Sequence, residues 1–100
     1  MTSEHCASGD WLVTSGSEDE FMDRWRDWLS TTSSGVEGFG SARLLRSADD
    51  PRRFTSISEW SDTGARDAWK QSAGFEEGFS ACRALCDEFR GGDFTEVVHV

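Results

Sequence analysis

Two side chains of this 100-residue chain could carry acid–base or anion-binding chemistry, and they lie far apart in the sequence. His99 could act as a general base, because an unperturbed imidazole titrates at about pH 6.5. More often, a histidine in this setting is a strand-edge or interface side chain. Arg43 stands among apolar neighbours, where a charge is either paired or functional. Glu59 could pair with Arg43 across a hairpin, so the arginine is either half of an ion pair or a group that binds an anion.

Three cysteines are the remaining candidates for a reactive or metal-binding site: Cys6, Cys82 and Cys86. An odd number of cysteines in a chain without an export signal argues against disulfides. Cys82 and Cys86 would share one face of a helix, a spacing that two metal ligands could use. Only His99 could be invoked as a further ligand. Because free cysteine is among the most buried residue types, we interpret this pair as small core side chains.

Aromatic rings are the most distinctive feature of the composition, with five tryptophans and seven phenylalanines but no tyrosine. Such rings usually fill a core, because they bury more apolar surface than other side chains. Some of them could instead line a ligand pocket or a dimer interface. Whether a ring lies in the core, a pocket or an interface therefore depends on the helix or strand that carries it.

The hydrophobic periodicity predicts alternating strands and helices. Ser17 to Glu20 has the form of a helix capping box, and Phe21, Trp25, Trp28 and Leu29 then recur on one helix face. Gly74 is expected to break the second helical region, and Gly91-Gly92 to end its second piece. The expected elements are a strand over 9–15, a helix from 17 that ends in the Ser/Thr cluster 30–34 and Gly35, strands over 37–47 and 54–60, helices over 62–73 and 75–90, and a strand over 94–100.

The order β-α-β-β-α-β predicts an α+β, ferredoxin-like fold. Helices would cover one face of an antiparallel sheet, and the other face would pack against a second copy of the chain. On the strand 54–60, Phe54, Ser56, Ser58 and Trp60 should share one face. We expect a flexible N-terminal tail over residues 1–8 and a single domain over residues 9–100.

The net charge of −9 excludes several classes of partner. Binding to a nucleic acid backbone or to an anionic membrane needs a basic surface, so neither is expected. No apolar run approaches the roughly 18 residues of a membrane span. The N-terminus has neither a basic region nor an apolar core, so no signal peptide is predicted and a cytoplasmic location is expected.

Several short motifs occur in an order that resembles the antibiotic biosynthesis monooxygenase family over residues 9–100. They are Gly16 before an acidic helix start, Glu37-Gly-Phe39, Glu59-Trp60, Ala68-Trp69 and Phe75. The resemblance implies a homodimer of ferredoxin-like protomers whose sheets pack face to face into an α/β barrel. It also implies a pocket between the sheet and the helices of each protomer.

One branch of this family degrades haem with an asparagine on the first strand, a tryptophan on the second helix and a histidine that ligates iron. Matched to this chain, these positions fall on Gly9, Trp69 and Phe79. Two of the three chemical groups are missing, and phenylalanine cannot ligate iron. The match therefore argues against haem degradation.

Another branch oxidises polyketide anthrones with molecular oxygen and without a metal or a flavin. The resemblance thus implies a cofactor-independent monooxygenase that acts on an aromatic or polyketide-like molecule. Trp69 would orient the substrate and its oxyanion, with Arg43 or His99 assisting. The residues implied to bind the substrate are Trp25, Trp28, Trp60, Phe75 and Phe79.

Two alternatives to an oxygenase stay open on the sequence. The chain could be a non-catalytic dimer that binds small aromatic ligands, or a cofactorless cyclase or isomerase of polyketide intermediates. The rings assigned to substrate binding could also be core residues, and the position of Trp60 in the match is mainly structural. Fold alone does not decide among these functions.

Overall fold

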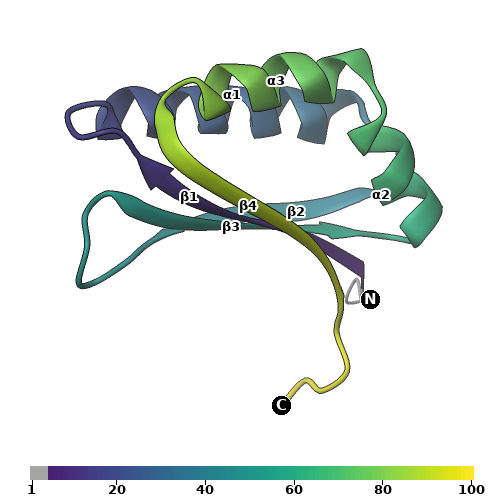
Figure 1. Ribbon diagram of the computed structural model, residues 1–100. Helices are drawn as coiled ribbons and strands as arrows, with labels where there is room; N and C mark the ends of the chain where they lie inside the picture. The colour runs from purple at the N-terminus through teal and green to yellow at the C-terminus, as the bar shows by residue number, and fades with distance from the viewer. Residues whose placement is uncertain (1–4) are drawn as a thin grey trace.

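The computed structural model describes residues 5–100 and has the predicted α+β, ferredoxin-like architecture, with the second helical region divided in two (Figure 1). Its elements in chain order are β1 (His5–Val13), α1 (Glu18–Gly35), β2 (Phe39–Arg46), β3 (Arg53–Trp60), α2 (Thr63–Lys70), α3 (Ala73–Arg83) and β4 (Cys86–Thr95).

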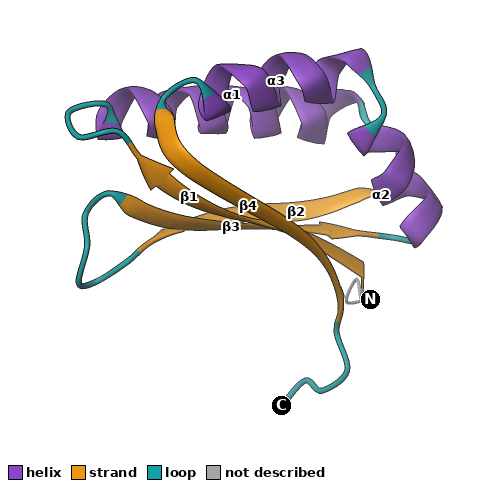
Figure 2. Ribbon diagram, in the orientation of Figure 1, coloured by secondary structure: helices purple, strands orange, loops and turns teal. Residues whose placement is uncertain are grey.

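The four strands form one antiparallel sheet in the order β2-β3-β1-β4. All three helices lie on the same side of this sheet (Figure 2). The predicted alternation along β3 is confirmed, because Phe54, Ser56, Ser58 and Trp60 are all buried under the helices. We call this side of the sheet the inner face and the opposite side the outer face.

The core between the inner face and the helices is built mainly from aromatic rings. Trp11, Phe21, Phe54 and Trp60 are the largest fully buried side chains. Trp11 and Phe21 lie with their ring centroids 5.3 Å apart, and Phe21 lies 5.1 Å from Phe54. The rings of β1, α1 and β3 therefore interlock directly. This packing explains why the predicted apolar face of the first helix points at the sheet.

The N-terminal half differs from the sequence prediction at the start of the first strand. β1 begins at His5, where it pairs with β3 and β4, so residues 5–8 belong to the sheet and not to the predicted tail. Residues 1–4 lie outside the described residues. α1 ends at Gly35, which together with the Ser/Thr cluster 30–34 was predicted to end it. The hydroxyls of Thr32 and Ser34 donate to the carbonyls of Trp28 and Ser30 one turn earlier, so both side chains are hydrogen-bonded within the helix.

The helix break near residue 72 is set by a cap and not by glycine. Ser72 is the N-cap of α3, and its Oγ accepts a hydrogen bond from the Phe75 amide at 3.1 Å. This interaction satisfies one of the free N–H groups at a helix start. Gly74 lies inside α3, so its predicted role as a helix breaker was wrong.

The predicted helix over 75–90 was wrong in its second half, because the chain becomes strand β4 at Cys86. On β4, Phe89 packs against Trp11, with 4.4 Å between the ring centroids. Gly91 and Gly92 lie within β4, where their missing side chains leave room for the Phe89 and Phe94 rings. β4 ends at Thr95, so residues 96–100, including His99, follow the last strand and do not form it.

The cysteine pair does not share a helix face, because Cys82 is on α3 and Cys86 begins β4. Burial raises the pKa of Cys82 to about 12, and the neighbouring Cys86 adds to the effect. Burial likewise raises the pKa of Cys86 to about 11, against a smaller lowering by Arg83. Both thiols therefore stay protonated at neutral pH, as expected for core side chains.

Two further findings concern residues 5–100. No group of three or more His, Cys, Asp or Glu side chains among them is arranged to hold a metal ion. No helix formed by these residues is both long and apolar enough to cross a membrane.

Candidate functional site

An inner pocket of about 200 Å³ lies between the sheet and α3. Aromatic rings from both layers form most of its wall: Trp11, Trp28, Phe75, Phe79 and Phe89. Phe75 and Phe79, one turn apart on α3, stack with their centroids 5.6 Å apart and their planes within 6°. Phe79 then meets Phe89 of β4 edge-on at 4.9 Å. The helical spacing of the α3 phenylalanines thus produces a continuous apolar wall facing β4.

The floor of the inner pocket depends on a glycine and a serine. A Cβ atom at Gly9 would lie 2.8 Å from Trp11 Nε1 and 3.0 Å from Ser56 Oγ, so a side chain there would displace the floor. Ser56 Oγ accepts a hydrogen bond from Trp11 Nε1 at 3.0 Å. Within the part of the chain that the structure describes, the Ser56 hydroxyl has no acceptor of its own. Gly9, where the haem-degrading branch has asparagine, therefore gives the pocket its depth.

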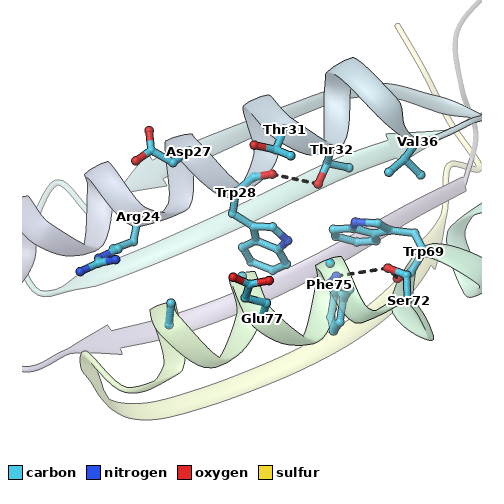
Figure 3. A pocket seen from close by; sticks show the side chains of 13 residues that line it. Arg24, Asp27, Trp28, Thr31, Thr32, Val36, Trp69, Ser72, Phe75 and Glu77 are labelled. Carbon is cyan, nitrogen blue, oxygen red and sulfur yellow. Dashed lines mark hydrogen bonds between the residues drawn. The ribbon is translucent and has the colours of Figure 1, made fainter.

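A second cavity, of about 340 Å³, lies between α1 and the α2–α3 segment. We call it the interhelical cleft (Figure 3). The Trp28 ring reaches from α1 toward α3, and the Trp69 ring of α2 lies beside it. Trp28 and Phe75 line both the interhelical cleft and the inner pocket. These two rings therefore form the wall between the two cavities.

The Trp69 ring has three aromatic neighbours, and two of them, Trp28 and Phe75, line the interhelical cleft with it. Trp28 stacks on it at 5.7 Å, and Phe75 meets it edge-on at 4.7 Å. Trp60 lies beneath it at 4.8 Å, on the inner face of the sheet. Only 5% of Trp69 is exposed, so packing against these three rings holds its position.

The indole N–H groups of Trp28 and Trp69 are both buried, and neither has a hydrogen-bond partner among residues 5–100. The other two buried indoles on the inner face are paired, Trp11 with Ser56 and Trp60 with Ser58. A buried donor without an acceptor costs about 1–3 kcal/mol, and native structures contain few of them. Two such donors, on rings that stack on each other, mark this place as a candidate binding site.

Trp28 approaches α3 closely because residue 78 is glycine. A Cβ atom there would lie 2.1 Å from Trp28 Cδ1, too near for any side chain. The absence of a side chain on this turn of α3 therefore holds the Trp28 indole between the two cavities.

The structure gathers some of the residues predicted for the site and separates others. Trp28, Trp69, Phe75 and Phe79 lie together around the two cavities. Trp60 is fully buried beneath Trp69, and Trp25 is buried on the side of α1 that faces β2. These two rings line neither cavity and pack in the core.

Arg43 and His99 do not lie near Trp69. On β2, Arg43 is paired in register with Ile57, so its side chain projects from the outer face of the sheet. The predicted pairing of Arg43 with Glu59 was wrong, because the β2–β3 register places Ser41 opposite Glu59, where its hydroxyl bonds Glu59 Oε2 at 2.7 Å. His99 lies beyond β4, where the chain continues away from the helix layer (Figure 1).

Several residues of the inner pocket were missed by sequence reasoning. Trp11 and Phe89 were assigned to a short strand and to a helix, so their meeting across β1 and β4 was not foreseen. The sequence around Ser56 showed only that it belongs to an alternating strand and did not indicate a role in a pocket. Lys70 could have been identified, because it is the only lysine of the chain and directly follows Trp69. Its side chain lines the inner pocket.

Comparisons with known proteins are consistent with this geometry. The family model for antibiotic biosynthesis monooxygenase matches residues 7–81. No curated protein sequence matches the chain. Among solved structures, SnoaB, a cofactor-independent oxygenase from Streptomyces nogalater, is similar with a TM-score of 0.87 and 24% identity, over 98% of this chain and 97% of that one. A conserved protein from Methanosarcina mazei Go1 gives 0.84 and 20%, over 96% and 95%.

Proposed function

Because the chain belongs to the antibiotic biosynthesis monooxygenase family, we propose that it is a small cofactor-independent monooxygenase that oxidises an aromatic or polyketide-like molecule with O₂. One observation carries this proposal. The buried N–H groups of Trp28 and Trp69 have no acceptor among residues 5–100, and both residues line the interhelical cleft. An electron-rich aromatic that develops a negative oxygen would supply the missing acceptor while its rings pack on the walls.

The proposed reaction needs few acid–base groups from the protein. For a hydroxylated anthrone, a proton leaves the reacting carbon to solvent, and the resulting carbanion passes one electron to O₂. The radical pair then forms a C–O bond, and the peroxide anion takes up a proton to become a hydroperoxide. The O–O bond breaks as the second hydrogen of that carbon leaves, so that CH₂ and O₂ become C=O and H₂O. The protein's tasks are to stabilise the oxyanion and to exclude water.

The roles of the residues follow from their positions in this proposal. Trp69 donates its indole N–H to the substrate oxyanion, and Trp28 donates beside it. Trp28 also stands between the two cavities, so a turn of its ring would open the inner pocket toward Trp69. Phe75 and Phe79 hold the aromatic rings of the substrate. Arg43 and His99 would contribute only across an interface with a second copy.

We propose a homodimer formed through the outer face of the sheet. Large apolar side chains are exposed there and just beyond β4: Leu45 at 48%, Phe94 at 59% and Val97 at 86%. Uncovered apolar patches of this kind usually mark an association surface. Light scattering at micromolar concentration should give twice the mass of the chain, and a monomeric mass would contradict the dimer.

A second function, binding of small aromatic ligands without turnover, is favoured by one specific observation. Among the residues that line the inner pocket, only Lys70 is ionisable. A pocket without a carboxylate or an imidazole lacks the usual general bases. Ring closure of a polyketide intermediate, the third possibility, would need no oxygen and can be tested under anaerobic conditions.

Oxygen consumption by metal-free protein tests the proposal, with a panel of hydroxylated anthrones and smaller phenols. We expect uptake with wild-type protein and a loss of about 100-fold in Trp69→Phe, since one oxyanion donor is removed. Trp60→Phe is the matched control, because its indole already bonds Ser58 and lies below the site. Tight binding of the panel without uptake would replace the oxygenase by a binding protein.

A further inference from the structure

Among the described residues that line the inner pocket, Lys70 is the one with an ionisable side chain. It is the last residue of α2, and 31% of its side chain remains exposed. The rest of the lining consists of aromatic rings, small residues and two serines. An ammonium group at the edge of an apolar aromatic pocket will select the charge of whatever binds there.

The charged neighbours of Lys70 leave part of its hydrogen-bonding capacity unused. Its Nζ bonds Asp93 of β4. Arg66 Nε lies 3.8 Å from the same Asp93 oxygen and 3.2 Å from Asp67. These four residues form a balanced set of two cations and two carboxylates. An ammonium group has three N–H donors, and Asp93 is its one acceptor among the described residues, so two donors are available to a ligand.

We propose that Lys70 binds the substrate as a phenolate, and that the ligands of the inner pocket are hydroxylated aromatics held in their ionised form. The inference rests on the proposed function, since it names the substrate class of the same site. The phenol O–H proton leaves to solvent at the exposed edge of the pocket. Lys70 keeps its own protons and donates a hydrogen bond to the phenolate oxygen. The ionised ring is the more electron-rich species, which is the form that gives an electron to O₂.

The alternative role of Lys70 is structural, as the ion pair that joins α2 to β4. Two variants separate the roles. Lys70→Met removes both the charge and the ion pair, whereas Asp93→Asn breaks the ion pair and leaves the ammonium in place. A structural role predicts similar effects of the two variants on binding. A phenolate-binding role predicts opposite effects, because Asp93→Asn removes the carboxylate that competes for the ammonium.

A one-ring probe suits the measurement, since an apolar cavity of about 150 Å³ already admits benzene. We would titrate 4-nitrophenol, whose absorption reports its ionisation, with wild-type protein under anaerobic conditions. Wild type should lower the apparent pKa of the bound phenol by about 1–3 units, as a cation within a few ångströms does. Lys70→Arg should preserve most of the shift, Lys70→Met should abolish it, and Asp93→Asn should keep or enlarge it. Melting temperatures would confirm that each variant is folded.

Each outcome separates this inference from the oxygenase proposal. A Lys70-dependent shift without oxygen uptake on any panel compound would support phenolate binding and contradict the oxygenase. Oxygen uptake together with an equal phenol pKa in wild type and Lys70→Met would overturn the role of Lys70 alone. Failure of wild-type protein to bind 4-nitrophenol, or equal losses in Lys70→Met and Asp93→Asn, would also overturn it.

Discussion

The two faces of the four-stranded sheet carry different kinds of polar group. On the inner face, the polar groups of β3 are the hydroxyls of Ser56 and Ser58, each paired with an indole N–H. On the outer face, β2 and β3 present Arg43 and Glu59 beside exposed apolar side chains. Neutral groups can be buried once they are hydrogen-bonded, whereas charges are far more expensive to bury. The inner face is thus suited to a dry reaction site and the outer face to association.

The largest expected difference in the loss of stability is between substitutions on the inner face and on the outer face of β3. Trp60→Ala should destabilise the protein by about 3–5 kcal/mol, because it opens a cavity beneath Trp69. Ile57→Ala, on the outer face of the same strand, should cost only about 1 kcal/mol in the protomer, since the side chain is half-buried. Urea unfolding measures both. If Ile57 also contacts a second copy, its effect should grow with protein concentration.

Equal losses for these two variants at low protein concentration would contradict the division between the faces. The m-value serves as the control, because an unchanged slope shows that the folded and unfolded states still differ by the same exposed area.

A smaller difference in stability is expected between Gly→Ala substitutions at two positions of α3. Gly78→Ala should cost about 1–3 kcal/mol, because the new methyl group would overlap the Trp28 ring and overpack the cavity wall. Gly74→Ala meets no atom within 4 Å and should stabilise the helix by up to about 1 kcal/mol. Thermal unfolding checks both. Similar changes in melting temperature would show that Trp28 is not held against α3.

Stability should also decline at alkaline pH. The pKa values of Cys82 and Cys86, about 12 and about 11 in the folded chain, exceed the ordinary 9.0 of the unfolded thiols. The unfolded chain therefore loses protons first, and the unfolding free energy falls as pH rises above about 9. Below that pH the contribution is fully present. The chain has no tyrosine and one lysine, so few other side chains titrate in this range.

Urea unfolding from pH 8 to 11 follows this decline, with the Cys82→Ala, Cys86→Ala double variant as control. A slope as steep in the double variant as in wild type would assign the decline to other groups.

The sequence predicted the strand and helix faces better than it predicted the pairing between them. The alternation from Phe54 to Trp60 was correct, because one buried face imposes a period of two. The end of α3 was not found, since the helical spacing of Phe75, Phe79 and Cys82 continues by coincidence to Phe89 on β4. Only the position of β1, which pairs with Cys86–Thr95, decides that this segment is a strand.

The aromatic residues of the candidate site could be predicted from the sequence, but its polar residues could not. Trp28, Trp69, Phe75 and Phe79 were identified from their spacing and from the family resemblance. Arg43 was expected to meet Glu59, but strand register depends on turn geometry and fixed Ile57 as its neighbour. Lys70 was overlooked because a lysine at a helix end is usually a solvated side chain that complements the helix dipole.

In the proposed site, the indole N–H groups of Trp28 and Trp69, which have no partner among residues 5–100, donate hydrogen bonds to the substrate oxygen. The most direct test is to observe the five indole N–H resonances while a hydroxylated anthrone is added under anaerobic conditions. The Trp28 and Trp69 protons should move downfield as they gain an acceptor, whereas Trp25 and Trp60, which line neither cavity, should stay in place. Saturable binding that leaves the Trp28 and Trp69 resonances unmoved would contradict the claim.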